Sequence, residues 1–529
     1  MQKTNVLIIG AGPTGLMAAC QLQRYNINYI IIDKKEGPTK ESRALLLHAR
    51  SLEILDQMEI AEEAIEQGEI IQKAQFIIGN KKVQEIRLGA IGRGLSPFPF
   101  LLVLEQSKNE EMLSKYLQHN GGEVLWNTEM RSLEKDNDKV LVVVKNNNNE
   151  KSVIQADYVI AADGGRSSVR DVLDIPFEGG TYEHIFYVAD TKLDWQWGHD
   201  KLSIYLHKQT FLGLFPMKGE KRFRAIGILP PSYQNEHPET FEEIVPHIQQ
   251  QVKIPLKFSD TDWFSIYRLH HRCIQNFRND HVFFAGDAAH IHSPAGGQGM
   301  NTGLQDAYNL AWKLAFVIKG LAKEDLLNTY EQERLPFAKQ LIASTDRAFA
   351  IITSVKWYNR LFRMRIMPVF FSLLFRLKRT RLRVFKTISQ IGIRYISSDL
   401  TVNRVTKLLN VKAGERFPYM TTKDGTSVYN MLKEPLFHAL VFSKKKQSRL
   451  ATEASEMETE FRKIFKVIDM TKEERIMQQF KISTDTVILI RPDNYIGLIT
   501  DEGIKVVKDY LKKLQPEAEV PSLQSEVGG

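Results

Sequence analysis

The sequence predicts an α/β protein built on a dinucleotide-binding unit. An apolar strand over residues 5–9 runs into a glycine loop, and a helix over 13–25 and a buried strand over 29–32 follow. This order of strand, turn, helix and strand is typical of a Rossmann-like βαβ unit. Short alternating strands between residues 176 and 273 predict an inserted, largely antiparallel sheet. Mixed strand and helix patterns over 414–514 predict a smaller α/β domain after it.

The glycine loop reads Gly10-Ala11-Gly12-Pro13-Thr14-Gly15. Gly10 allows a tight turn after the strand, Gly12 lets the backbone approach a pyrophosphate, and Gly15 permits close packing of helix on strand. The helix that follows presents free N–H groups and the positive end of its dipole to the diphosphate. Asp33 ends the second strand and is placed to accept hydrogen bonds from ribose hydroxyls. By itself, the loop indicates only a dinucleotide.

Two later segments of the sequence indicate which dinucleotide the protein binds. The first is Asp163-Gly164-Gly165-Arg166-Ser167-Ser168-Val169-Arg170, which follows an apolar strand. The second contains Gly286-Asp287 and continues through Pro294 to a glycine-rich turn. The three segments in this order resemble the group A flavin monooxygenases, the family of para-hydroxybenzoate hydroxylase, phenol hydroxylase and the aromatic-polyketide oxygenases. The resemblance spans most of the chain. It implies FAD as cofactor, NAD(P)H as transient co-substrate and O2 as oxidant.

The resemblance also implies roles for residues around the flavin. Asp287 should bind a ribityl hydroxyl, and Pro294 should lie beside the flavin C4a atom. Arg43 matches an arginine that lies next to the flavin in the family, so Arg43 and Pro294 are the expected catalytic residues. A helix that begins near Met300 should direct its positive end at the flavin and stabilise the anionic reduced form. The full expected cofactor-binding set is Gly10, Gly12, Pro13, Thr14, Gly15, Asp33, Lys34, Arg43, Gln106, Asp163, Gly286, Asp287, Pro294, Gly297, Gly299, Met300 and Asn301.

The same resemblance predicts roles for four further residues. Gln106 and Glu110 match a Gln-x-x-x-Glu element, in which the glutamine contacts the cofactor and the glutamate is structural. His290 and His292 could act as bases. Because they lie in a structural turn of the family, we interpret both as structural rather than as acid–base groups.

The inserted sheet is the expected substrate site. Tyr205, His207, Phe211 and Phe215 are candidates for the wall of its cavity, although each could equally pack in the core or face outward. No arginine suited to clamp a carboxylate is evident in this region, which favours a phenolic or polycyclic aromatic substrate over a small benzoate. The resemblance implies hydroxylation of that ring through a flavin C4a-hydroperoxide.

The composition and the charge of the chain argue against several classes of protein. Apolar residues make up 43% and charged residues 25% of the 529-residue chain, as in soluble globular proteins. The two cysteines form no CxxC and no zinc spacing, which predicts a cytoplasmic protein without disulfides or a metal site. Twelve Lys or Arg and no Asp or Glu occur over residues 347–394. This basic segment predicts either a solvated helical face or peripheral contact with an anionic membrane. No nucleic-acid reader module accompanies it.

The sequence also predicts how the chain divides into domains, and it leaves alternatives open for the function and the oligomeric state. The region after 405 resembles the thioredoxin-like domain of many group A hydroxylases but lacks the redox CxxC. A flavin epoxidase or antibiotic-inactivating oxygenase at a membrane surface is an alternative function, and a non-catalytic flavoprotein scaffold is another. A monomer and a homodimer both remain open. The expected domains are a discontinuous FAD-binding domain at 1–175 and 275–345, a substrate sheet at 176–274, a basic helical segment at 346–405, a thioredoxin-like domain at 406–514 and a disordered tail at 515–529.

Overall fold

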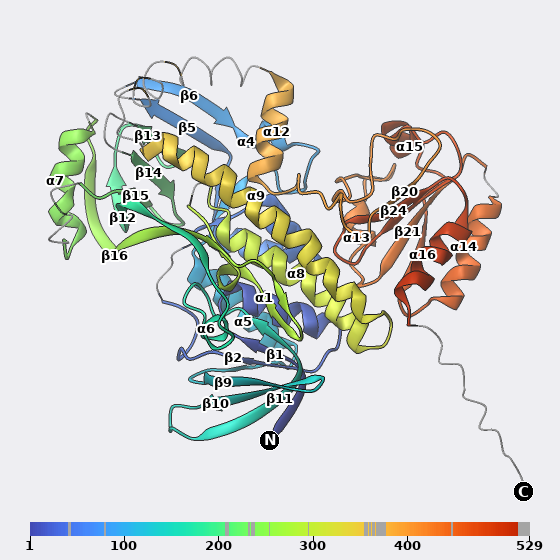
Figure 1. The fold of residues 1–529 in the computed structure, drawn as a ribbon. Helices are drawn as coiled ribbons and strands as arrows, with labels where there is room; N and C mark the ends of the chain where they lie inside the picture. The colour runs from blue at the N-terminus through green and yellow to red at the C-terminus, as the bar shows by residue number, and fades with distance from the viewer. Residues whose placement is uncertain are drawn as a thin grey trace, which may run out of the picture.

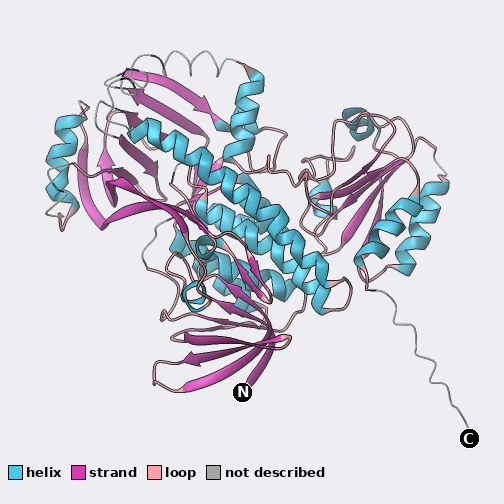
Figure 2. Cartoon of the chain, in the orientation of Figure 1, coloured by secondary structure: helices cyan, strands magenta, loops and turns pink. Residues whose placement is uncertain are grey.

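Three larger units make up the chain in the computed structural model (Figure 1). An α/β unit contains the N-terminus, a second unit is dominated by a large curved sheet, and a third contains the C-terminal helices and strands (Figure 2). The fold class predicted from the sequence is therefore confirmed. The structure describes residues 1–40, 44–78, 81–206, 211–230, 233, 238–252, 254–294, 296–353, 358, 361, 366, 377–445 and 448–516.

The first sheet carries the dinucleotide-binding unit. Its strand order is β17-β18-β11-β1-β2-β8, and β10 and β9 continue from β11. Strand β1 pairs in parallel with both β2 and β11, and Val6, Leu7 and Ile8 on β1 are fully buried. A central parallel strand needs apolar side chains on both faces because helices cover both sides. The strands are β1 (Gln2–Ile9), β2 (Tyr29–Ile32), β8 (Val124–Leu125), β9 (Glu129–Asp136), β10 (Lys139–Lys145), β11 (Lys151–Ala161), β17 (Arg278–Asn279) and β18 (Val282–Phe284).

Long helices pack beside this sheet. Helix α1 (Pro13–Arg24) follows the glycine loop and packs on α5 (Gln106–His119) and on α8 (Gly299–Ile318). Helix α8 crosses the middle of the molecule next to α9 (Asn328–Thr353) (Figure 1). The residues of α8 from Asn301 to Phe316 are all buried, so other parts of the protein surround this helix on all sides.

The second sheet is wider than the sequence indicated. Its order is β19-β16-β12-β15-β14-β13-β5-β6, so two strands from residues 73–87 join the strands of the expected 176–274 region. Strand β5 pairs in parallel with β13, and all other pairings in this sheet are antiparallel. The strands are β5 (Lys73–Ile78), β6 (Lys81–Arg87), β12 (Glu178–Asp194), β13 (Leu202–Leu206), β14 (Phe211–Pro216), β15 (Arg222–Ile228), β16 (Lys257–Cys273) and β19 (His290–Ile291).

The C-terminal unit has a five-stranded sheet in the order β20-β24-β23-β21-β22. Strands β21 and β22 are parallel, whereas β23 is antiparallel to both β21 and β24. Phe437 on β21 packs edge-on against Trp312 and Phe316 of α8, with both ring-centroid distances at 5.8 Å. The elements are β20 (Val402–Arg404), α13 (Val428–Met431), β21 (Phe437–Phe442), α14 (Arg449–Glu460), β22 (Phe465–Asp469), α15 (Glu474–Phe480), β23 (Thr486–Ile490), β24 (Ile496–Thr500) and α16 (Ile504–Leu514).

Shorter elements connect these units. Within the described part of the chain, no helix has the length and apolarity needed to cross a membrane. Helix α12 (Lys378–Ile388) lies within the basic segment and packs on α4 (Leu88–Gly92). The remaining elements are β3 (Leu46–Leu47), α2 (Ala49–Gln57), α3 (Ala61–Gln67), β4 (Glu69–Ile71), β7 (Leu101–Val103), α6 (Ser168–Val172), α7 (Phe241–Gln251), η2 (Gly286–Ala288) and η3 (Glu324–Leu327).

Candidate functional site

The glycine loop has the shape of a diphosphate cradle. Gly10 has a φ of +104°, and a Cβ there would lie 2.3 Å from the Ala162 carbonyl oxygen. A Cβ on Gly15 would lie 1.8 Å from the Gly10 carbonyl oxygen. A Cβ on Gly12, in contrast, would meet nothing within 4 Å. Gly10 and Gly15 are therefore required by packing, and Gly12 borders open space at the N-terminus of α1, where an anion is favoured.

Asp33 holds this loop from the end of β2. Its Oδ2 accepts a 2.6 Å hydrogen bond from Ala11 N, and its Oδ1 accepts a 2.9 Å bond from Lys35 N. The carboxylate is 10% exposed, so it retains a face toward solvent. The adjacent Lys34 is exposed. Asp33 thus lies at the edge of the cradle, where a ribose would meet it.

Gln106 and Glu110 lie on α5 and hydrogen-bond to the segment that follows β2. Gln106 Oε1 accepts a 3.1 Å bond from Ala44 N, and its Nε2 donates to Glu110 Oε1 at 2.9 Å. Glu110 is fully buried and accepts from Thr39 N at 2.7 Å and Lys35 Nζ at 3.2 Å. These contacts make Glu110 a structural residue, as interpreted from the sequence. Arg43, one of the two predicted catalytic residues, lies outside the described residues.

The Asp163-Gly164 turn follows β11 at the same edge of the sheet. Asp163 Oδ2 accepts hydrogen bonds of 3.2 Å from Ser168 Oγ and from Val169 N at the start of α6. Burial raises the pKa of the Asp163 carboxyl. Gly164 has a φ of +85°, and a Cβ there would meet nothing within 4 Å. The turn therefore presents backbone rather than side chains to the space beside Gly12.

Asp287 is the one exposed residue in a segment that is otherwise buried from Val282 to His290. It lies in η2, directly after Gly286, whose φ is +60°. A carboxylate that projects from a buried turn can accept hydrogen bonds from a hydroxyl outside it. Pro294 is exposed as well, four residues after His290. Both side chains are exposed on the segment from η2 to the start of α8, where the resemblance predicts contact with a flavin.

The N-terminus of α8 completes the cradle. The first N–H groups of a helix have no partner within the helix, and here they belong to Gly299, Met300 and Asn301. Gly297 approaches Leu46 so closely that a Cβ would lie 2.6 Å from Leu46 Cδ1. The Met300 side chain lies near α5, with its Sδ 3.6 Å from Asn109 Nδ2. The helix dipole favours a negative charge at this end, such as that of a reduced flavin.

Two residues of the predicted cofactor set direct their side chains into the protein. Thr14 lies against α8, because Cβ atoms on Gly286 and Gly303 would lie 2.5 Å and 2.2 Å from its Oγ1. Asn301 is fully buried, and its Nδ2 donates to Leu46 O at 2.7 Å and to Gly297 O at 3.0 Å. These two side chains thus serve the packing around the cradle, and both residues stay predictions as cofactor-binding residues. Their backbone N–H groups remain at the two helix N-termini.

His48, which no sequence motif singled out, lies beside the same turn. Its Nε2 is 3.0 Å from the Gly297 carbonyl oxygen, and its backbone N–H donates to Asn301 Oδ1 at 2.8 Å. Burial lowers the pKa of His48 to about 4, so the ring is neutral at physiological pH. A single histidine in an apolar run has no periodicity or motif that would reveal this contact.

The second sheet has two apolar faces, and the residues predicted to line a substrate cavity lie on both of them. Phe215 packs in one cluster with Leu45 and Leu46, and Leu46 lies against Gly297 in the segment between β18 and α8 (residues 286–298), which we call the flavin turn. Phe211 lies on the same face as Phe215, because a Cβ on Gly213 would meet both phenylalanine rings. Tyr205 packs instead with Phe241 of α7 on the opposite face and is 2% exposed.

The structure therefore places the Tyr205 side chain in the core next to α7, which is one of the alternatives that the sequence left open. Successive side chains of a strand point to opposite faces, and the sequence did not show which face meets the flavin. His207 lies outside the described residues.

A buried arginine also lies on the flavin side of this sheet. Arg224 pairs with Phe215 across the ladder and binds Asp190 through Nε at 2.6 Å and Nη2 at 2.7 Å. Its guanidinium carbon is 5.2 Å from the centre of the Trp263 ring. Because Asp190 neutralises it, Arg224 is not a free clamp for a carboxylate.

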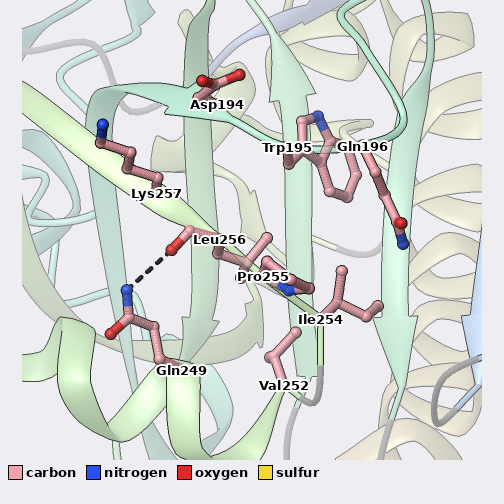
Figure 3. Close-up of a pocket in the computed structure, with 9 residues that line it drawn as sticks. All are labelled: Asp194, Trp195, Gln196, Gln249, Val252, Ile254, Pro255, Leu256 and Lys257. Carbon is pink, nitrogen blue, oxygen red and sulfur yellow. Dashed lines mark hydrogen bonds between the residues drawn. The ribbon is translucent and has the colours of Figure 1, made fainter.

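The pocket in Figure 3 lies away from this site. It has a volume of about 520 Å³ and is lined by residues that include Asp194, Trp195, Leu256 and Lys257. Gln249 of α7 donates a 2.8 Å hydrogen bond to Leu256 O at its edge. The pocket's residues Val252, Ile254 and Leu256 belong to the cluster of Tyr205 and Phe241, on the face of the second sheet opposite Phe215. The pocket is therefore not the substrate site of the flavin.

The fold and the cradle define a dinucleotide-binding protein, with the glycine loop, Asp33 and the Asp163-Gly164 turn on the Rossmann-like unit. The FAD binding domain family matches residues 3–345. The chain belongs to this family, and within it to the FAD-dependent monooxygenases. FAD fits the residues present: open space borders Gly12, and acidic acceptors lie at Asp33 and Asp287.

Individual relatives agree with this membership. A flavin-dependent monooxygenase of Mycobacteroides abscessus is 30% identical over 530 residues, covering 96% of this chain and 100% of that protein. The 6-methylpretetramide 4-monooxygenase of Streptomyces rimosus is 35% identical over 350 residues, or 66% of this chain. The match spans 62% of that relative's own length. The structure of the anhydrotetracycline hydroxylase OxyS from Streptomyces rimosus superposes with a TM-score of 0.77 at 24% identity, covering 98% of this chain and 100% of that one.

Proposed function

We propose that this protein hydroxylates a phenolic or polycyclic aromatic substrate at the expense of NAD(P)H and O2. The observation that carries the proposal is the apolar face of the second sheet, where Phe215 packs in one cluster with Leu46, the residue against which Gly297 lies. An apolar wall suits a flat aromatic ring. The pairing of Arg224 with Asp190 supports a substrate without a carboxylate. Relatives named for pentachlorophenol and for tetracycline precursors act on such rings.

The chain's own residues have three tasks in this reaction. The glycine loop and the N-terminus of α1 bind the diphosphate, and Asp33 and Asp287 accept hydrogen bonds from cofactor hydroxyls. The N-terminus of α8 supplies a positive potential at the flavin end. FAD, when bound, supplies electron transfer from the nicotinamide and the activation of oxygen. Pro294 and the phenylalanine wall exclude water and hold the ring in position, since proximity and desolvation both raise the rate.

The proposal is tested with the purified holoenzyme, NADPH or NADH, and a panel of phenols, polycyclic aromatics and non-aromatic alkenes. We expect one class of ring to accelerate nucleotide oxidation and to gain one oxygen atom. In an ¹⁸O2 atmosphere, mass spectrometry should place the label in the product. Nucleotide oxidation that yields only hydrogen peroxide with every compound would contradict the proposal and indicate an oxidase or a scaffold. A labelled epoxide on a non-aromatic compound would indicate the alternative epoxidase.

Two variants of the second sheet provide a matched comparison in the same assay. We expect Phe215→Ala to raise KM and to release more peroxide per nucleotide, because the apolar wall beside the turn is opened. Tyr205→Phe changes an aromatic residue on the opposite face and should leave the product yield unchanged. Equal losses in both variants would show that the wall lies elsewhere.

We further propose that the basic segment contacts an anionic membrane surface. Helix α12 exposes Lys378, Arg379, Arg383 and Lys386, and none of these has an ion-pair partner among the described residues. Lys378 and Arg381 also line a pocket of about 300 Å³ with Arg87. Flotation with vesicles rich in phosphatidylglycerol should carry the protein upward at low salt, and neutral vesicles should not. Protein that stays at the bottom of both gradients would rule the contact out.

The C-terminal unit supports a thioredoxin-like assignment. Strands β21 and β22 are joined through α14, and α15, β23, β24 and α16 follow in that order. The unit lacks a CxxC, and its docking on α8 supports a structural role rather than a redox one. A homodimer would be consistent with such a role.

A further inference from the structure

Asp306 is a buried carboxylate that joins three separate segments around the flavin turn. Its Oδ2 accepts hydrogen bonds from Gly286 N at 3.1 Å and from His290 Nε2 at 2.7 Å. Its Oδ1 accepts from Arg334 Nε at 2.7 Å. The Asp306 side chain is 1% exposed and the Arg334 side chain is 0% exposed. Asp306 thus connects α8 to η2, to β19 and to α9.

These contacts bear directly on the groups that face the cofactor. Gly286 immediately precedes Asp287, so the bond from Asp306 fixes the turn from which that carboxylate projects. Asp306 lies seven residues beyond Gly299, which places it about 10 Å along α8 from the helix N-terminus. Arg334 Nη2 also donates to Thr302 O at 3.2 Å, within the first turn of α8.

The ion pair keeps both partners charged in the interior. Burial opposes ionisation of Asp306, yet Arg334 and His290 together lower the pKa of its carboxyl below the ordinary value. The negative charge of Asp306 and the positive charge of Arg334 therefore cancel close to the flavin. Charges inside a protein are screened far less than those at its surface, so an imbalance here would act on the flavin.

We propose that Asp306 and Arg334 are positioning residues that fix the Gly286–Asp287 turn and balance the charge felt by the flavin. Neither residue is expected to touch the cofactor. The inference rests on FAD occupying the cradle and is independent of which substrate is hydroxylated. It also explains why His290 lies in this segment: it donates to Asp306 and stacks on Phe277 with ring centroids 5.6 Å apart.

The test is the reduction potential of the bound flavin in two charge-changing variants of the holoenzyme. Asp306→Asn leaves the guanidinium unbalanced and should raise the potential, because a positive charge favours the anionic reduced flavin. Arg334→Gln leaves the carboxylate unbalanced and should lower the potential. Both variants should bind FAD about tenfold more weakly, as read by flavin fluorescence, which corresponds to about 1.4 kcal/mol. Loss of structure alone would not shift the two potentials in opposite directions.

Two control variants complete the design. Glu333→Gln changes the residue next to Arg334 on α9, which is equally buried but bonds to Lys313 and Arg491, away from the turn. Its potential should match that of the wild type. Arg334→Lys keeps the charge and loses the second bond to Thr302 O, so its potential should be unchanged while its FAD binding weakens.

Shifts of the same sign in both charge-changing variants, or no shift in either, would overturn the proposal. If either of these variants failed to fold, Arg334→Lys with wild-type FAD affinity would also overturn it. Because both readouts need no substrate, a failure to hydroxylate any ring leaves this result intact.

Discussion

Replacing Glu333 with alanine is expected to lower the free energy of unfolding by about 3–5 kcal/mol, since one partner of a buried ionic cluster is removed. Glu333 accepts from Arg491 Nη1 at 2.5 Å and Nη2 at 2.9 Å, and from Lys313 Nζ at 2.8 Å. All three side chains are fully buried. The substitution leaves two cations, of which only Arg491 keeps an anionic neighbour, Asp493.

This cluster joins the C-terminal unit to α8 and α9, so its loss should also separate the two units. Chemical unfolding followed by tryptophan fluorescence measures the effect, because Trp312 lies between the units. Lys466→Ala removes a partly exposed ion pair with Glu434 and serves as the control, with an expected cost of at most about 1 kcal/mol. A Glu333→Ala variant as stable as this control would show that the cluster contributes no net stability.

The ion pairs of Glu333 also predict that the stability of the folded protein depends on pH. Burial opposes ionisation of Glu333, but Arg491 and Lys313 hold the pKa of its carboxyl far below the ordinary value of 4.5. The folded state therefore binds the proton less readily than the unfolded state, and stability falls as the pH drops below 4.5 toward the folded pKa. Asp306 contributes in the same direction. Glu333→Gln should flatten this acid limb of the unfolding curve.

The glycine motifs could be predicted from the sequence because their requirements are local. A positive φ at Gly10, or a Cβ that would collide within the same turn at Gly15, leaves a signature in adjacent residues. The pairing of β5 with β13 joins residues more than a hundred positions apart and leaves no such signature. The face of β13 on which Tyr205 lies depends on what packs there, namely α7 and not the flavin turn.

The buried ion pairs could not be predicted for a similar reason. Glu333 and Arg334 are adjacent on α9, and in the sequence they resemble an exposed helical pair. The structure sends them to different partners, Arg491 and Asp306, because α9 lies between the flavin turn and the C-terminal unit. Only the packing of three units around α8 makes both side chains interior. Neither a sequence motif nor hydrophobic periodicity could therefore predict that Glu333 and Arg334 connect the three units.

Replacing Gly12 with valine should abolish FAD binding and preserve the fold, which separates the two roles of the glycine loop. Gly12 has a φ of −80° and a ψ of −175°, an extended conformation that valine readily adopts. Its side chain would enter open space and occupy the place where a diphosphate approaches the loop. Losing two charge-assisted hydrogen bonds, each worth about 1.5–3 kcal/mol, predicts at least a hundredfold higher dissociation constant for FAD.

The contrast with Gly15→Val makes this prediction specific. A Cβ at position 15 would lie 1.8 Å from the Gly10 carbonyl oxygen, so that variant must displace α1 from β1 and should unfold at a markedly lower temperature. The Gly12→Val protein should instead keep the circular dichroism spectrum and melting temperature of the FAD-free wild type and elute without yellow colour. A Gly12→Val protein that retained stoichiometric flavin would place the diphosphate elsewhere. The open space at this one position would then need another explanation than the cofactor.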